Sequence, residues 1–325
     1  MMERQAPRLP RCGPGSRRAI AHPDRLAVAG IQRQSRRSTM CAAPRLERHR
    51  YGKRRVRLTH LDRGVSPHRF AVCTVDVALE GDFAASYTAG DNRSVVATDS
   101  MKNTVYVLAR EHGVDSIERF ASLLAGHFVD SYAAVDAALI EVQQERWQPI
   151  EAGGEVAASA FWRGGSELAL ASARCSADGL ELRCGLDRLQ VAKTSDSGFS
   201  DFHRDRFTTL ADTEDRIFAT TVSAELRGTA LAASSAADDL ARRDALRAAL
   251  LGTFAAHRSR SVQETLHAMG TAVLDRLAEV EAVTLRLPNQ HHPLVDLTPF
   301  GLDNPNCVFV GTDEPFGDIE ATLVR

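Results

Sequence analysis

The chain contains no run of about 18 uncharged apolar residues, so no segment has the pattern of a transmembrane helix. It also contains no Cys-x-x-Cys pair, and its six cysteines lie far apart, at 12, 41, 73, 175, 184 and 307. A zinc ribbon and a disulfide framework are therefore disfavoured, and free thiols in a reducing compartment are expected. The chain has 325 residues, 44% hydrophobic content and a formal net charge of −2. These values indicate a soluble globular protein that is long enough for two domains.

Lysine is absent from residues 1–50, which carry 12 Arg against three acidic residues and so a net charge of +9. Proline, glycine and serine interrupt this segment, and it shows no sustained apolar periodicity. We therefore expect a basic, disordered extension over residues 1–49. Three interpretations stay open: an organellar transit peptide, a nucleic-acid-binding arm, or an artefact of start-site choice, because Met40 lies just ahead of the first ordered-looking stretch.

Alternating apolar and polar residues dominate from residue 51 onward, and helical periodicity interrupts them. Cys73, Val75 and Val77 share one face of a half-buried strand, and a turn or bulge follows at 80–83. Behind a Ser116 cap, apolar residues recur at helical spacing. In this first half we predict strands at 70–79, 134–143, 155–163 and 166–174, and helices at 101–112 and 117–128.

The second half repeats the same order of elements. Strands are predicted at 180–193, 206–226, 280–288 and 306–310, and helices at 236–256 and from 261 onward. Two copies of a β-β-α-α-β-β order predict an α+β fold of tandem domains, each a sheet with a helical layer on one face. We place the first domain at 50–177 and the second at 178–325.

The motif Ser-Val-Gln-Glu at 261–264 has the spacing of a capping box, and a plain helix start is its ordinary meaning. Val262 and Gln263 would then occupy the first turn, where backbone N–H groups are free and the helix dipole favours an anion. Arg216 is a candidate for a bidentate clamp on a planar anionic ligand. A surface ion pair is the commoner role for such an arginine.

Three further candidates each have an equally ordinary alternative. Thr98 and Asp99 stand at the end of a short strand-like run that leads into a helix, where either would serve as an N-cap. Lys53 lies among four arginines and fits a solvated basic face. Phe199 follows a Ser/Gly loop and suits either a stacking platform or the core.

Two adjacent histidines, His291 and His292, raise the question of a metal site. Zinc and iron sites need three or more ligands at coherent spacing, and the other histidines supply no partner set. Asp296 is the one carboxylate that alternates with them in the run that follows. An acid/base histidine held by its neighbours therefore fits better than a metal ligand.

Several long motifs together resemble one family, the cofactor-independent urate oxidases, or uricases. They appear in the family's order and cover nearly all of residues 51–325, whereas residues 1–50 lie outside the match. The matching stretches are YGKRRVRL at 51–58, GDNRSVVATDSMKNTVYVLAR at 90–110, LQVAKTSDSGFSDFHRDRFTTLADTEDRIFAT at 189–220, SVQETLHAMG at 261–270, and the block from LPNQHHPLVDL to the end at 287–325.

The resemblance implies a T-fold, with tandem domains of antiparallel sheet and paired helices, assembled as a homotetramer around a tunnel. It implies active sites at subunit interfaces that need no metal or organic cofactor and convert urate, O₂ and water to 5-hydroxyisourate and H₂O₂. By the same resemblance the catalytic proton relay comprises Lys53, Thr98 and His291. The substrate-binding residues are Thr98, Asp99, Phe199, Arg216, Val262, Gln263 and Asn289. In the family, Lys53, Thr98 and Asp99 face a site whose other residues come from a neighbouring subunit.

The chain departs from the family pattern at Ser159, Leu226, Gln290 and Cys307, none of which is a mapped catalytic residue. It ends in Leu-Val-Arg and not in the peroxisomal Ser-Lys-Leu of eukaryotic members, so a cytoplasmic, bacterial-type enzyme is expected, with no nucleic-acid or membrane partner. Two alternatives remain: a T-fold purine-binding tetramer without turnover, and a T-fold enzyme acting on pterins. Pterin enzymes often use zinc or a glutamate anchor, for which no matching cluster is present.

Overall fold

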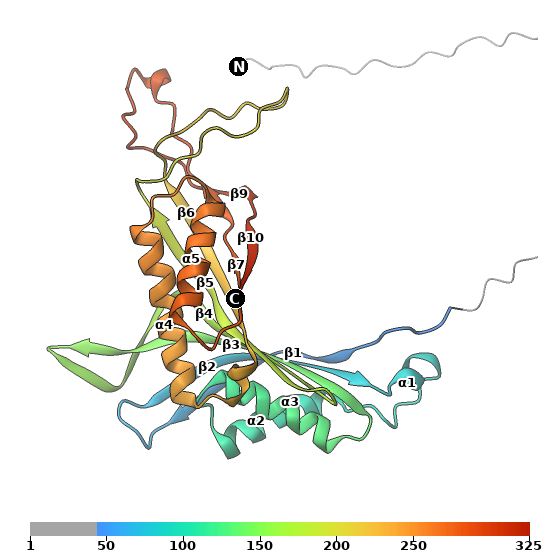
Figure 1. The fold of residues 1–325 in the computed structure, drawn as a ribbon. Helices are drawn as coiled ribbons and strands as arrows, with labels where there is room; N and C mark the ends of the chain where they lie inside the picture. The colour runs from blue at the N-terminus through green and yellow to red at the C-terminus, as the bar shows by residue number, and fades with distance from the viewer. Residues whose placement is uncertain (1–43) are drawn as a thin grey trace, which may run out of the picture. The chain divides into compact units, whose positions relative to one another are not determined.

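A computed structural model of the protein describes residues 44–325 (Figure 1). Most of the predicted extension over 1–49 therefore lies outside the described residues, and its nature stays a prediction. Residues 46–325 form a single contact unit. None of the described helices is long and apolar enough to cross a membrane.

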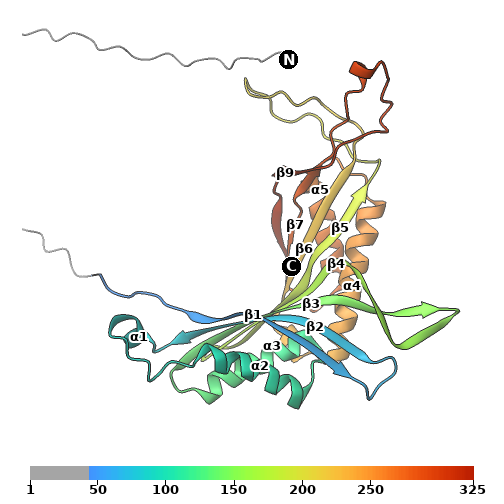
Figure 2. The same ribbon diagram turned by 180° about the vertical axis from the view of Figure 1, so that it is seen from behind.

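One antiparallel sheet runs through this unit, and its strands follow the chain order (Figures 1 and 2). Strand β2 (Arg69–Gly81) has the predicted alternation: Cys73, Val75 and Val77 are at most 1% exposed, while the side chains between them are partly solvated. The neighbouring strands, in order across the sheet, are β1 (Tyr51–Asp62), β2 (Arg69–Gly81), β3 (Val135–Ala152), β4 (Glu155–Ser176), β5 (Gly179–Lys193), β6 (Phe218–Arg227), β7 (Ala282–Arg286) and β10 (Glu320–Val324). The short β8 (Asn289–His291) pairs with β6 and with β9 (Thr312–Gly317).

Two pairs of longer helices pack on this sheet: α2 (Thr98–His112) with α3 (Ile117–Ser131), and α4 (Ala236–Ala256) with α5 (Val262–Arg276) (Figure 1). Helix α3 begins after Ser116, whose hydroxyl accepts the Arg119 N–H as predicted, and it buries one apolar stripe. Helices α2 and α3 contact β1 and β3–β5, whereas α4 and α5 contact β5, β7 and β10. The helices are α1 (Ala84–Thr88), α2 (Thr98–His112), α3 (Ile117–Ser131), α4 (Ala236–Ala256) and α5 (Val262–Arg276), with 3₁₀ turns η1 (Thr229–Ala233) and η2 (Thr298–Phe300).

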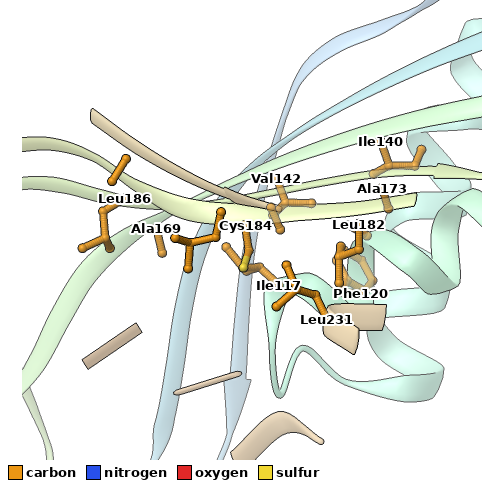
Figure 3. Packing of buried hydrophobic residues seen from close by; sticks show 14 of the residues in the cluster. Ile117, Phe120, Ile140, Val142, Ala169, Ala173, Leu182, Cys184, Leu186 and Leu231 are labelled. Atoms are coloured by element: carbon orange, nitrogen blue, oxygen red, sulfur yellow. The ribbon is translucent and has the colours of Figure 1, made fainter. Parts of the chain in front are cut away.

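The buried hydrophobic residues form one continuous core that includes side chains from both halves of the described chain. Figure 3 shows side chains from α3, β3, β4, β5 and η1 in one layer, among them Phe120, Ile140 and Leu186. The predicted α+β class and the repeated β-β-α-α-β-β order are therefore confirmed. The predicted domain division at 177/178 falls in the turn between β4 and β5, and it stays a prediction.

Several predicted strands differ from the structure. Residues 206–217 are loop, and β6 begins only at Phe218. The predicted strand at 306–310 is also loop, joined to the rest by a single bridge between Leu294 and Phe309, while β9 and β10 went unpredicted. The predicted strands at 155–163 and 166–174 form one continuous strand, β4. The ladder with β3 continues across the residues between them with a shift in register.

The structure does not show the N-cap role that was the alternative for Thr98 and Asp99. Thr98 is the first helical residue, Ala97 is the N-cap, and no side chain caps this end. The residues before it form no strand. Asp99 instead lies in the first turn, where its carboxylate accepts hydrogen bonds from Lys102 and Asn103 and faces the positive end of the helix.

Candidate active site

A cavity of about 810 Å³ opens between the loop that joins β5 to β6 and the segment that follows β8. These two segments lie at the same end of the sheet in both views (Figures 1 and 2). Phe199, Arg216, Asn289 and His291 all line the cavity. The structure thus brings together four of the predicted site residues, although up to 92 positions separate them in the chain.

Backbone hydrogen bonds join the β5–β6 loop to the residues that precede α5. The Gly198 N–H donates to the Ser259 carbonyl at 2.8 Å, and the Ser259 N–H donates to the Asp196 carbonyl at 2.9 Å. The Arg216 N–H donates to the Ser197 carbonyl at 2.7 Å. These bonds join the loop segments next to Phe199 and Arg216 to the residues just before α5, even though the loop has almost no regular secondary structure.

Arg216 is a cation without a counterion in the described part of the chain. No carboxylate there pairs with its guanidinium, and its buried Nε has no hydrogen-bond partner. Burial lowers the pKa of Arg216 because the charged form loses solvation. Its Cζ lies 5.5 Å from the centre of the Phe199 ring, a cation–π contact. The surface ion pair considered as an alternative is absent among these residues, and the arrangement fits an anionic, planar ligand.

Three buried polar atoms on the elements that carry this site have no hydrogen-bond partner among the described residues. Besides Arg216 Nε, they include the hydroxyls of Ser197 and Thr220, two residues that are fully buried. Thr220 lies directly opposite Asn289 in the pairing of β6 with β8. Of these three residues only Arg216 lines the cavity, so its guanidinium is the group whose hydrogen bonding a ligand there would complete.

Strand β8 delivers its residues to the cavity between two neighbours. Asn289 pairs with Thr220 on one side and Gly317 on the other, and His291 pairs with Thr312. Gln290, which departs from the family pattern, donates from Nε2 to the Thr221 hydroxyl at 3.3 Å.

The second histidine of the pair also lines the cavity, and it has a structural bond of its own. His292 Nδ1 lies 3.2 Å from the Gln290 carbonyl. Within residues 44–325 no group of three or more His, Cys, Asp or Glu side chains is placed to hold a metal ion.

Helix α5 begins beside the cavity with a partial form of the predicted capping box. The Ser261 hydroxyl accepts the Glu264 N–H at 3.1 Å, as predicted. The Glu264 carboxylate, however, accepts the Arg260 N–H and not that of Ser261. Bonds to Arg260 lower the pKa of Glu264 to about 2.

Val262 and Gln263 occupy the first turn of α5, where no intrahelical acceptor exists for their N–H groups. Neither residue lines the cavity. The bridge between Ser197 and Ser259 holds the residues just before this turn against the loop that carries Phe199 and Arg216.

Lys53, Thr98 and Asp99 form a second group, at the start of β1 and the start of α2. The Tyr51 hydroxyl links the two elements by accepting the Val96 N–H at 2.8 Å and donating to the Val96 carbonyl at 3.1 Å. A hydrogen bond from Lys102 lowers the pKa of Asp99, and the charge of Lys53 adds to this effect. These residues do not line the cavity, and α2 lies well away from the β5–β6 loop in Figures 1 and 2.

Sequence reasoning missed the apolar wall of the cavity, which includes Leu210, Pro293, Leu294 and Phe309. Leu210 was assigned to a strand at 206–226. The better indicator was composition, because residues 201–215 are rich in Asp, Arg and Thr and lack the β-branched apolar residues typical of a strand.

Comparison with known proteins decides the family. A sequence model described as Uricase matches residues 49–173 and 182–320. The chain belongs to the uricase family. It is 40% identical to the uricase of Arthrobacter globiformis, over 86% of this chain and 90% of that protein, and 36% identical to the uricase of Dictyostelium discoideum, over 85% and 96%.

Solved structures of the uricase family agree with the fold. The crystal structure of uricase from Arthrobacter globiformis superposes with a TM-score of 0.79 at 40% identity, covering 87% of this chain and 95% of that one. A urate oxidase structure from Bacillus sp. TB-90 is 22% identical with a TM-score of 0.74, which supports the fold alone. The T-fold predicted from the resemblance is confirmed.

Proposed function

We propose that this uricase-family chain oxidises urate with O₂ and water to 5-hydroxyisourate and H₂O₂, without a metal or organic cofactor. The observation that carries the proposal is Arg216, a half-buried guanidinium that has no counterion among residues 44–325 and lies against the Phe199 ring in a large cavity. Urate is a flat purine that binds as an anion. An unpaired cation beside an aromatic face suits both of these properties.

Substrate binding in this proposal uses the group around the cavity. The pyrimidine edge of urate forms aligned hydrogen bonds with Arg216, the Gln263 side chain and the Val262 N–H. Phe199 supplies a face for ring stacking. The free N–H groups at the start of α5 and the dipole of that helix favour the negative charge.

The chemistry in this proposal uses residues from both groups. Thr98 and Asp99 meet the imidazole edge, and Asn289 with Thr98 holds O₂ or water above the ring. Lys53 lowers the cost of an alkoxide-like Thr98, and His291 shuttles the proton. Twice-deprotonated urate is electron-rich enough to pass two electrons to O₂. Water then adds at C5 and peroxide leaves, which balances the overall reaction.

Assembly is part of the proposal, because the two groups of proposed site residues lie apart within a single chain. Lys53, Thr98 and Asp99 do not line the cavity that holds Arg216 and His291. A homotetramer in which a neighbouring chain contributes the first group would complete each site. Size-exclusion chromatography with light scattering measures the assembly, and an active monomer would contradict this part of the proposal.

A cytoplasmic location belongs to the same proposal. The four cysteines within residues 44–325 are all free thiols, as is usual for a reducing compartment. Cell fractionation of the native host tests the location.

The deciding experiment follows loss of urate absorbance together with peroxide formation, in protein treated with a chelator. We expect turnover in the wild type, loss of turnover in Lys53→Met and His291→Ala, and a KM about 10- to 100-fold higher in Arg216→Gln, because a charge-assisted bond is lost. Arg206→Gln, an exposed arginine of the same loop, is the matched control and is expected to behave as wild type.

Each contrary result has a distinct meaning. Urate binding without turnover would favour the purine-binding alternative, and activity lost to the chelator would contradict cofactor-free chemistry. Normal turnover in Lys53→Met or His291→Ala would exclude the proton relay.

A further inference from the structure

Ser259 is the point at which the β5–β6 loop and helix α5 meet. Its backbone N–H and carbonyl both bond to that loop, to Asp196 and Gly198 respectively. Its hydroxyl points to the other side of the junction and donates to the Ser261 carbonyl at 3.1 Å. Ser259 is 1% exposed, so these bonds do not compete with solvent.

A second buried hydroxyl completes a small closed network. Thr265, one turn into α5 and 1% exposed, lies with its Oγ1 2.8 Å from the Ser259 hydroxyl and 3.2 Å from the Ser261 carbonyl oxygen. The Thr265 N–H also donates to that carbonyl at 3.2 Å. Each hydroxyl has one hydrogen, so the Thr265 hydroxyl reaches the Ser261 carbonyl either directly or through the Ser259 hydroxyl, which donates to it. The Ser261 carbonyl is therefore held by this hydroxyl network in addition to the usual helical bond.

The orientation of this carbonyl determines the orientation of the Val262 N–H. The two groups belong to the same peptide unit, which is planar and trans, so they point in opposite directions. Anchoring the oxygen toward Thr265 aims the Val262 N–H outward from the start of the helix. Hydrogen bonds to a peptide carbonyl also polarise the unit, which makes its N–H a stronger donor.

We propose that Ser259 and Thr265 are positioning residues that aim and polarise the Val262 N–H toward the substrate. They do not touch the substrate themselves. The inference rests on the proposed function, in which this N–H binds the pyrimidine edge of urate. A hydrogen bond weakens steeply when its donor is not aligned with the acceptor. The buried hydroxyls of Ser259 and Thr265 therefore contribute to substrate affinity by keeping the Val262 N–H aligned.

The test compares Thr265→Val, which keeps the side-chain shape but removes the hydroxyl, with Ser259→Ala and with Thr265→Ser, which restores the hydroxyl. Each hydroxyl deletion is expected to raise KM for urate about five-fold, the scale of one net hydrogen bond, and to change kcat less than two-fold. Thr265→Ser is expected to return KM to the wild-type value. Thr271→Val is the matched control, since the Thr271 hydroxyl makes a similar bond to the His267 carbonyl on the exposed face of the same helix.

Binding of xanthine, which shares the pyrimidine-dione edge of urate but lacks its 8-oxo group, is measured in parallel by titration calorimetry. Its dissociation constant is expected to rise by the same factor as KM. Two soluble, folded deletion variants with wild-type KM and xanthine affinity would overturn the inference, and so would a fall in kcat at constant KM. If Thr265→Val does not fold, Ser259→Ala alone decides. A wild-type protein that neither binds nor oxidises urate would instead refute the proposed function, and this inference with it.

Discussion

The buried ion pair between Glu118 and Arg243 joins helix α3 to helix α4. Arg243 Nη2 lies 2.9 and 3.0 Å from the two carboxylate oxygens of Glu118. The side chains are 3% and 11% exposed, so water screens the pair only slightly. We predict that replacing Glu118 with Leu will strongly destabilise the protein.

The magnitude follows from what Arg243 would lose. Its Nε already has no partner, and its other contact, from Nη1 to Gln144, is long at 3.4 Å. A buried guanidinium left without its carboxylate costs about 3–5 kcal/mol, which for a chain of this size lowers Tm on the order of 10 °C. Removing both charges, in Glu118→Leu with Arg243→Met, is expected to recover most of that loss, because no uncompensated charge then remains.

Urea unfolding followed by circular dichroism measures these changes. All variants are compared at one fixed protein concentration, because the proposed assembly would make stability depend on concentration. The matched control is Glu225→Leu, which breaks the pair with Arg183 at 3.2 Å where both side chains are 48% exposed. That change is expected to cost about 0–1 kcal/mol. Equal losses for the Glu118 and Glu225 variants, or a double variant no more stable than Glu118→Leu, would refute the reasoning.

Two further predictions concern titrating groups. The pKa of Glu264 is held at about 2, below its usual 4.5, so the carboxylate stabilises the fold above pH 4.5 and that contribution is lost as the pH falls toward 2. Glu264→Gln is expected to lower the free energy of unfolding at pH 7 and to make that free energy fall less steeply between pH 4.5 and 2. Acid unfolding measures this dependence, and a variant with the same pH dependence as wild type would contradict the assignment. Burial raises the pKa of Cys73 and Cys184 to about 12, so both thiols stay protonated at pH 8. Mass mapping after iodoacetamide treatment is expected to find them unlabelled until the protein is denatured, and native labelling would show that these positions open readily.

The helices were largely predictable from sequence because local features specify them. The Ser116 cap, the stripe of Ile117, Phe120 and Leu124, and the bounds of α4 all follow from spacing within a few turns. Strand β2 was equally readable, since one of its faces is buried and the other is solvated. The family motifs added the site residues, which no periodicity indicates.

The sheet's irregular parts were not predictable in this way. Residues 206–217 do not form the predicted strand but include part of a cavity wall, and their backbone bonds to more distant residues go to Ser197 and Phe199. Strands β9 and β10 are short and mostly exposed, so they carry little apolar pattern of their own. Their pairing partners decide that they are strands.

The double histidine shows the same division between local pattern and distant contacts. Its sequence indicates polar residues at a strand end, and a metal site was a reasonable alternative. Only the folded chain places His291 in one cavity with Arg216 and Phe199, and bonds the His292 ring to the Gln290 carbonyl. Composition and periodicity are properties of neighbouring residues, so they determine the helices and the fold class. A site depends on the distances between residues that are remote in the sequence. Those distances are set only when the strands pair and the tertiary structure forms.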